Sequence, residues 1–269
     1  MSLSFDKIND DSKPIAIYNN GKEEKFVFLT PDDYEFGRGI NKSDAGAKKI
    51  KLSEKSHGSF FPVINPVKNG ENDRIYISGR SGIGKSYKFI RPYILEFKKR
   101  YPKSKVFFFS SKMKDMAVDD LPIIRLNVDD NFIENPPRLD DFKSNISNSA
   151  NLLVFDDVQD YPSAKHIKAL YRFRNEAIRN GRSYKIYTLF LYHKPTAGHD
   201  TAEQIFESTA AVIFPNKSGF NDYDRLLETY LGIRDSKTKE LLKRSKSDYV
   251  YISKSTPAFV VSDKYILAL

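Results

Sequence analysis

Hydrophobic and polar positions along the chain follow two patterns, which together predict an α/β protein. Short, continuous apolar runs predict strands covered on both faces, at residues 75–77, 106–109, 152–155, 186–192 and 210–214. Residues 87–100 and 164–180 instead place apolar side chains at helical spacing. Strands and helices alternating in this order predict βαβ units, and therefore a central, mainly parallel β-sheet flanked by helices.

The segments on either side of this core predict β-rich additions. Apolar residues 14–18 and 25–29 flank Asn20-Gly21, which predicts a hairpin, and residues 60–64 predict an edge strand. Residues 31–58 are polar and aperiodic, as in a long loop. We therefore expect a β-rich N-terminal extension, residues 1–60, before a core domain of residues 61–269.

The C-terminal part of the core predicts helices at residues 201–208, 222–231 and 236–246, then a β-hairpin from 249–252 and 258–261. A short strand is expected within 121–126 and a short helix from residue 140. No apolar run is long enough to span a membrane, and the N-terminus lacks the apolar stretch of a signal peptide. These features predict a soluble intracellular protein.

Composition restricts the chemistry. The chain has no cysteine, which excludes disulfides and thiolate metal sites, and no pair of its four histidines has the spacing of a helical zinc site. Lys and Arg number 44 against 35 Asp and Glu, a net charge of +9. This excess favours a polyanionic partner, nucleic acid before anionic membrane, although a Lys-rich surface without such a partner has the same composition.

The strongest motif is GRSGIGKS at residues 79–86, between a predicted strand and a predicted helix. A glycine, four residues and Gly-Lys-Ser form the phosphate-binding loop of nucleotide-binding proteins, since glycines let the backbone close around an anion at a helix N-terminus. Lys85 would reach the β- and γ-phosphates, and the Ser86 hydroxyl would ligate Mg²⁺. The predicted nucleotide-binding residues are Gly79, Arg80, Ser81, Gly82, Ile83, Gly84, Lys85, Ser86 and Tyr87.

A second motif is the apolar strand at 152–155 followed by Asp156 and Asp157. In ATPases with a phosphate loop, Asp156 would hold the Mg²⁺ shell through water, and Asp157 would activate the attacking water as general base or polarise it. A strand followed by an Asp-rich turn is the alternative for this segment alone. The two motifs together predict hydrolysis of a nucleoside triphosphate, with ATP and Mg²⁺ as cofactors.

Further polar residues are candidates for supporting roles. His193 ends the strand at 186–192, where it could sense the γ-phosphate or serve a structural purpose. Arg179 and Arg182 flank the turn into that strand, and either could act as an arginine finger on a neighbouring subunit or pair with surface acids. Residues 110–114 could contact phosphate or DNA, or form a solvated loop. The same alternatives hold for a basic cluster at 236–246, comprising Lys237, Lys239, Lys243, Arg244 and Lys246.

With these motifs placed, the sequence over residues 60–269 resembles the poxvirus-type packaging ATPases of large eukaryotic DNA viruses, within the FtsK–HerA superfamily. The resemblance is carried by residues 79–86 and 152–157, by RNGRSYKIYTLFLYHKP (179–195), and more loosely by residues 210–232 and 253–269. It implies a RecA-like P-loop NTPase fold. The chain departs from the superfamily in having Asp157 where Glu is frequent, and His193 where Gln is common.

The resemblance implies an ATP-hydrolysing motor that translocates double-stranded viral DNA into a capsid. It further implies a homo-oligomeric ring of five or six subunits, an arginine finger supplied by the neighbouring subunit, and contacts with capsid or portal-vertex components. Such a protein would act in the host cytoplasm or virus factory and in the virion. The alternatives are a helicase-like enzyme, a nucleotide kinase, or a nucleotide-dependent DNA-binding or scaffold protein with weak turnover.

Overall fold

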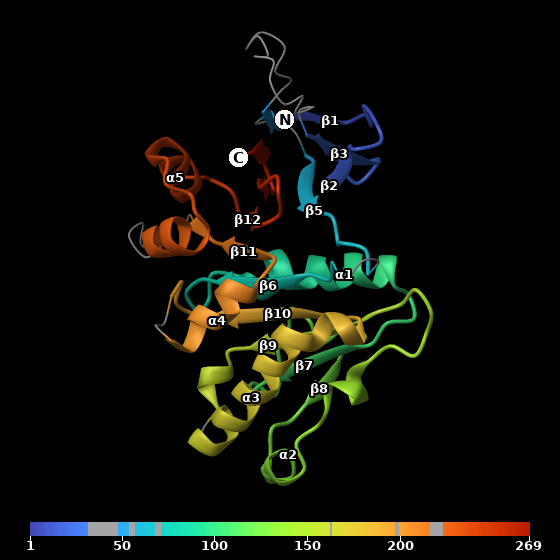
Figure 1. Ribbon diagram of the computed structural model, residues 1–269, viewed down its shortest axis with the longest axis vertical. Coiled ribbons are helices and arrows are strands. Elements are labelled where there is room, and N and C mark those ends of the chain that lie inside the picture. The colour runs from blue at the N-terminus through green and yellow to red at the C-terminus, as the bar shows by residue number, and fades with distance from the viewer. Residues whose placement is uncertain (32–47, 54–56, 68–70, 162, 197–198, 216–222) are drawn as a thin grey trace, which may run out of the picture.

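A ten-stranded sheet, ordered β4-β14-β13-β12-β11-β6-β10-β9-β7-β8, forms the centre of the protein (Figure 1). The structure is a computed structural model. It describes residues 1–31, 48–53, 57–67, 71–161, 163–196, 199–215 and 223–269 of the chain. Six neighbouring strands are parallel: β6 (Arg74–Ser78), β7 (Val106–Ser110), β8 (Ile124–Leu126), β9 (Asn151–Asp156), β10 (Ile186–Tyr192) and β11 (Ala210–Ile213).

The order of the parallel strands decides which motifs meet. Strand β10 lies between β6, which leads into the phosphate loop, and β9, which ends in Asp156. Because all three strands point the same way, their carboxyl ends share one edge of the sheet, where ligands bind in open α/β sheets. The predicted fold class, an α/β protein with a mainly parallel central sheet, is confirmed.

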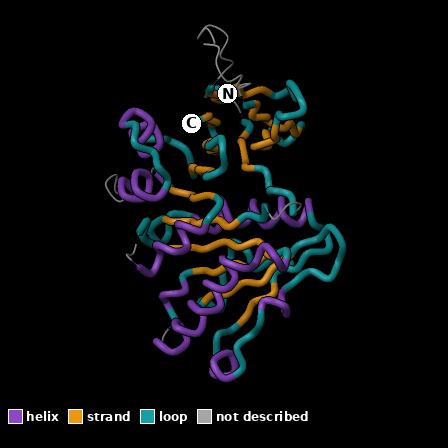
Figure 2. Tube along the Cα trace, viewed as in Figure 1, coloured by secondary structure: helices purple, strands orange, loops and turns teal. Residues whose placement is uncertain are grey.

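Helices cover both faces of this sheet, as the alternation of side chains along β6 illustrates. Ile75 and Ile77 pack with residues of α1 (Arg91–Arg100), whereas Tyr76 packs on the opposite face with residues of α3 (Ala164–Asn180). The α3 face also receives Ile205 of α4 (His199–Glu207) and Leu242 of α5 (Ser236–Lys243). The parallel sheet is thus the middle layer of three (Figure 2).

The predicted helix at 87–100 has an irregular start. Ser86–Ile90 forms one turn of π-helix, in which Arg91 N–H bonds to the carbonyl of Ser86, and α1 continues from it with Pro92 in its first turn. The wider turn stands directly before the proline, which has no N–H to donate. The helix expected from residue 140 is a 3₁₀ turn, Leu139–Phe142, and the short helix α2 (Asp130–Glu134) was not predicted.

The two ends of the chain add antiparallel strands. The predicted C-terminal hairpin is present as β12 (Val250–Ser253) and β13 (Phe259–Ser262), and β14 (Tyr265–Ala268) and β4 (Lys49–Lys51) extend it. A second, four-stranded sheet in the order β1-β3-β2-β5 contains the predicted N-terminal hairpin. Its strands are β1 (Ser2–Ser4), β2 (Lys13–Asn19), β3 (Glu24–Thr30) and β5 (Ser59–Pro62).

Part of two sequence predictions lies outside the described residues: most of the loop at 31–58, and the first residue of the helix at 222–231, whose described part includes a π-helical turn, Leu226–Tyr230. In the described ranges, no helix has the length and apolar character that crossing a bilayer requires.

Asp73, at the entrance to β6, makes the stability of the fold depend on pH. Its buried carboxylate accepts hydrogen bonds from the Tyr93 hydroxyl (2.7 Å) and the Asn65 amide (2.6 Å), and burial raises its pKa from 3.8 to about 6. Between pH 4 and 6 the folded protein therefore keeps a proton that the unfolded chain has released. We expect the free energy of unfolding to fall as pH rises through this window, by up to about 3 kcal/mol from this group.

Asp73→Asn should remove that contribution, measured by urea denaturation at several pH values between 4 and 7. Asp11→Asn, at an exposed position, is the control and should keep the parental profile. Parallel profiles for the parent and Asp73→Asn would contradict the assignment.

Candidate functional site

The phosphate loop, residues 79–86, leaves the carboxyl end of β6 in a conformation that requires glycine. Gly82 and Gly84 have φ angles of +77° and +91°, which side-chain-bearing residues rarely adopt. At Gly79, an added Cβ would lie 2.2 Å from Cδ1 of Ile83 and 3.1 Å from Cδ2 of Phe214, so a side chain there would displace that of Ile83. The loop then enters the helix at Ser86, an arrangement suited to an anion.

Lys85 points back across its own loop and toward β10. Its Nζ donates to the carbonyl oxygen of Gly79 (2.7 Å) and lies 3.2 Å from Nδ1 of His193. Burial lowers the pKa of Lys85 below its ordinary value, while the nearby charges of Asp157 and Asp156 oppose that effect. The phosphate-loop lysine and the strand-end histidine are therefore direct neighbours.

The two carboxylates after β9 are almost completely buried, with 2% of Asp156 and 1% of Asp157 exposed. Asp156 Oδ2 accepts a hydrogen bond from the Ser110 hydroxyl (3.0 Å), and burial, followed by the charge of Asp157, raises its pKa to about 6. Asp157 has a left-handed backbone (φ +48°), rare for a residue other than glycine and enriched at functional sites.

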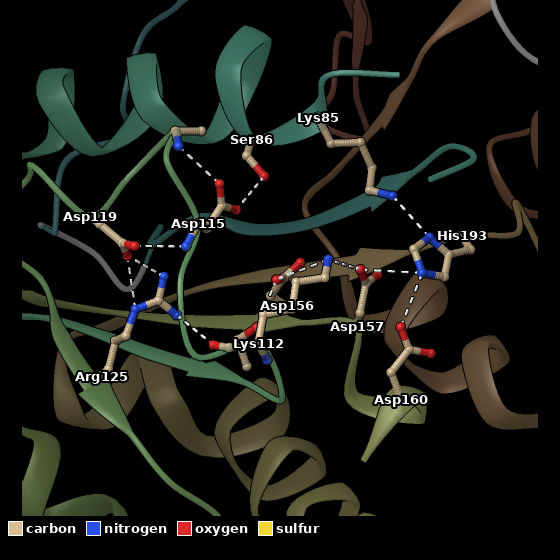
Figure 3. A network of polar contacts seen from close by, with 12 residues as sticks. Lys85, Ser86, Lys112, Asp115, Asp119, Arg125, Asp156, Asp157, Asp160 and His193 are labelled. Atoms are coloured by element: carbon tan, nitrogen blue, oxygen red, sulfur yellow. Dashed lines mark hydrogen bonds and ion pairs between the residues drawn. The ribbon is translucent and has the colours of Figure 1, made fainter. Parts of the chain in front are cut away.

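His193 links Asp157 to Lys85 of the phosphate loop (Figure 3). Its Nε2 lies 3.3 Å from Oδ2 of Asp157 and 3.3 Å from Oδ2 of Asp160. Since Nδ1 faces the Lys85 ammonium, which can only donate, Nδ1 must accept and Nε2 carries the hydrogen in the neutral ring. The ring is thus oriented from both sides.

The β7–β8 loop, residues 111–123, supplies two further contacts. The Lys112 ammonium donates to Oδ2 of Asp157 at 2.9 Å, and Asp115 accepts a hydrogen bond from the Ser86 hydroxyl at 3.0 Å (Figure 3). The sequence marked residues 110–114 as a segment that could contact phosphate or DNA or form a solvated loop, and Lys112 and Lys114 of this segment line the cleft, whereas Asp115 and Asp160 were not predicted. Their proximity depends on the strand order, which no single segment encodes.

These residues surround one cleft of about 340 Å³. Its lining includes Ser86, Lys112, Asp156, Asp157 and His193, together with most of the phosphate loop. The Ser86 hydroxyl and the carboxylates are hard oxygen donors of the kind that Mg²⁺ prefers. Moreover, among the described residues the buried Oδ1 of Asp157 has no hydrogen-bond partner. The donor set therefore fits a magnesium ion with its water shell.

The other predicted site residues are placed differently. Ser81, Gly82, Gly84 and Tyr87 line the cleft, whereas the Ile83 side chain belongs to the core. Arg80 contributes its carbonyl oxygen, 3.5 Å from Nζ of Lys85. Arg179 and Arg182 are exposed near the junction of α3 and β10, at the opposite edge of the sheet, and Arg179 pairs with Glu203. Within one subunit they do not join the site.

Comparison with known proteins gives one close relative. The chain is 31% identical over 263 residues to the uncharacterized protein V3 of Sputnik virophage, and the alignment covers 96% of each protein. No protein-family model matches the chain.

The comparison with solved structures gives partial matches. The genome packaging NTPase B204 from Sulfolobus turreted icosahedral virus 2, in complex with ATPγS, is 14% identical. It matches 73% of this chain and 98% of its own with a TM-score of 0.44. The cytoplasmic domain of the type VII secretion ATPase EccC from Thermomonospora curvata is 13% identical. This second match covers 81% of this chain and 28% of EccC with a TM-score of 0.49.

Gly84→Ala tests the phosphate loop. Alanine at φ +91° is strained by about 1–2 kcal/mol, so the loop should shift, and affinity for a slowly hydrolysed ATP analogue should fall by about tenfold or more. Gly232→Ala is the matched control, because Gly232 also has positive φ (+69°) and an added Cβ there meets nothing within 4 Å. Isothermal titration calorimetry measures both. Equal affinities for the two variants would count against a phosphate site at this loop.

Proposed function

Because the chain belongs to the family of the Sputnik virophage protein V3, and because its motifs resemble those of the FtsK–HerA superfamily and meet at one edge of a parallel sheet, we propose that it is an ATP-hydrolysing motor that moves double-stranded DNA into a viral capsid. One observation carries the catalytic part of this proposal. Lys85, Ser86, Asp156 and Asp157, from two motifs far apart in the sequence, line the same cleft. The relative is a virophage protein, which favours a viral context in the host cytoplasm or virus factory and in the virion.

The arrangement supports hydrolysis in the following way. Lys85 binds the β- and γ-phosphates, and Ser86, together with Asp156 through water, would hold a magnesium ion, which would neutralise phosphate charge. Asp157 accepts the proton of a water that attacks the γ-phosphorus, while the bond from that phosphorus to the bridging oxygen of ADP breaks. His193, held by Lys85 and Asp160, donates toward Asp157 and orients it, which suits a carboxylate one methylene shorter than Glu.

Charge on the surface supports a DNA partner, but at a different place from the basic cluster at 236–246. In that cluster Lys239 pairs with Glu228, Lys243 with Asp224, and Arg244 with Glu240. These carboxylates already neutralise the lysines and the arginine, so the helix offers little net charge to a phosphate backbone.

A groove of about 500 Å³ beside α3 is a better candidate for binding DNA. Its lining carries four basic residues, Arg138, Lys165, Lys168 and Arg172, against one acidic residue, Glu176. Within the described part of the chain no ion pair involves any of the four. We propose that this α3 groove binds the DNA phosphate backbone without reading sequence.

The oligomeric part of the proposal concerns Arg179 and Arg182. Both are exposed at the sheet edge opposite the cleft, so in a ring of five or six copies either can face the nucleotide of a neighbouring subunit. An arginine there would stabilise charge on the transferred phosphoryl group. Capsid or portal-vertex components would hold the ring at the particle.

ATP hydrolysis should require Mg²⁺ and increase on addition of linear double-stranded DNA. Lys85→Ala should reduce phosphate release by on the order of a hundredfold or more, because the phosphates lose their buried cation, with an unchanged circular dichroism spectrum.

Light scattering in the presence of nucleotide and DNA measures the oligomer. DNA-independent transfer to a nucleoside would favour a kinase, strand separation a helicase, and absent turnover a scaffold protein.

The groove is tested by the double variant Lys168→Ala/Arg172→Ala. Affinity for a short DNA duplex at moderate salt should fall by about tenfold, and the dependence of affinity on salt should weaken, since about two phosphate contacts are lost. The control is Lys237→Ala/Lys246→Ala, which removes the same charge from exposed positions of the cluster at 236–246. A larger loss in this control would assign DNA binding to that cluster instead.

A further inference from the structure

Lys112 neutralises the two carboxylates that end β9. Its Nζ lies 2.9 Å from Oδ2 of Asp157 and 3.8 Å from Oδ2 of Asp156. The lysine side chain is 46% exposed, whereas each carboxylate side chain is 2% exposed. Burial opposes the charged lysine, but the carboxylates outweigh it and raise the pKa of Lys112, so the ammonium is charged at neutral pH. The pair therefore joins a buried anion to a cation that can swing into solvent.

The hydrogen bond from Lys112 engages the carboxylate of Asp157, the residue proposed to act as the base. Oδ2 of Asp157 faces both the Lys112 ammonium and, at 3.3 Å, Nε2 of His193. Its other oxygen is buried. A carboxylate oxygen that already accepts from an ammonium is poorly placed to accept the proton of an attacking water. Opening the contact with Lys112 frees Oδ2 of Asp157 to act as the base.

Lys112 is not an isolated surface lysine, because the β7–β8 loop is tied to the site and to β8. Asp115 accepts from Ser86, and the Asp115 N–H donates to Asp119 at 2.7 Å. Arg125 of β8 donates both to Asp119 (2.9 Å) and to the carbonyl oxygen of Lys112 (3.2 Å), as Figure 3 shows. A displacement of Lys112 is thereby coupled to the rest of the loop, whose outer side exposes Met113 and Met116.

We propose that Lys112 is a positioning residue that holds Asp157 out of reaction, and that a magnesium-bound nucleotide draws its ammonium away and shifts the β7–β8 loop. The reason is electrostatic. A divalent cation at Asp156 repels an ammonium within a few ångströms, while triphosphate oxygens in the same cleft offer that ammonium an anionic partner. The long, flexible lysine side chain permits this exchange. The inference rests on the proposed ATPase function and adds a control step to it.

A fluorescent label on the loop tests the movement without requiring turnover. The chain has no cysteine, so Met113→Cys creates a unique attachment site at a side chain that is 93% exposed. We expect a change in emission when Mg²⁺ and a non-hydrolysable ATP analogue are added together, and less than about half of it when EDTA replaces Mg²⁺. In the labelled background, Lys112→Met should largely abolish the change, because the variant has no ammonium at residue 112 for the nucleotide to draw away.

The matched control is Lys105→Met, which removes the same charge from an exposed position just before the opposite end of β7 and should keep the full response. Lys112→Arg is the opposing variant. A guanidinium pairs with carboxylates more firmly, so this variant should show a reduced response and a lower kcat. It also keeps the experiment informative if Lys112→Met does not fold.

Kinetics supply the second readout. In the absence of DNA, Lys112→Met should raise kcat by about threefold or more with KM changed less than about twofold, because only the release of Asp157 is affected. A loss of activity comparable to that of Lys85→Ala would make Lys112 a phosphate-binding cation and overturn the proposal. The proposal would also be overturned if calorimetry showed that the nucleotide binds while the emission of the label stayed unchanged. If DNA did not stimulate ATP hydrolysis by the parent protein, that result would contradict the proposed motor function. The label experiment would still test the role of Lys112.

Discussion

Two adjacent carboxylates at the end of a buried strand are the constraint on which the site depends. Asp156 and Asp157 are nearly excluded from solvent, and like charges so close together are costly unless cations compensate them. Two cations supply the compensation, Lys85 after β6 and Lys112 after β7, and His193 after β10 adds a ring N–H that faces Asp157. The parallel sheet brings these residues to one edge. Fold and site are therefore consequences of the same strand order.

The fold was largely readable from the sequence, because its signals are local. Continuous apolar runs marked β6, β7, β9, β10 and β11, and helical spacing marked α1 and α3. What failed was short or non-local. Helix α2 has five residues, too few for a period, and the π-helical turn at Ser86–Ile90 has the same apolar spacing as an ordinary helix start. Strands β4 and β14 pair across more than 200 residues of chain, and no local pattern encodes that partnership.

The site residues also fall into two groups, those that the sequence predicted and those that it did not. Lys85, Ser86, Asp156 and Asp157 belong to motifs whose chemistry fixes their spacing, and His193 was singled out by its place at a strand end. Lys112, Asp115 and Asp160 carry no motif. They matter because β7 neighbours β9 and because the chain turns sharply at Asp157, so their partners became visible only with the strands in register. The charged residues that surround a motif are therefore identified only from the folded structure.

The pairing of β4 with β14 bears on where this protein can be cut. The strand pattern predicts a β-rich N-terminal extension at residues 1–60, and residues 49–51 within it form the outermost strand of the central sheet. A protein shortened to begin at residue 61 would leave β14 with a row of unpaired backbone groups. Such an edge invites other chains to add a strand, which leads to aggregation or domain swapping. The extension thus supplies the edge strand of the central sheet, and insolubility of a truncated protein would reflect the newly exposed edge of β14.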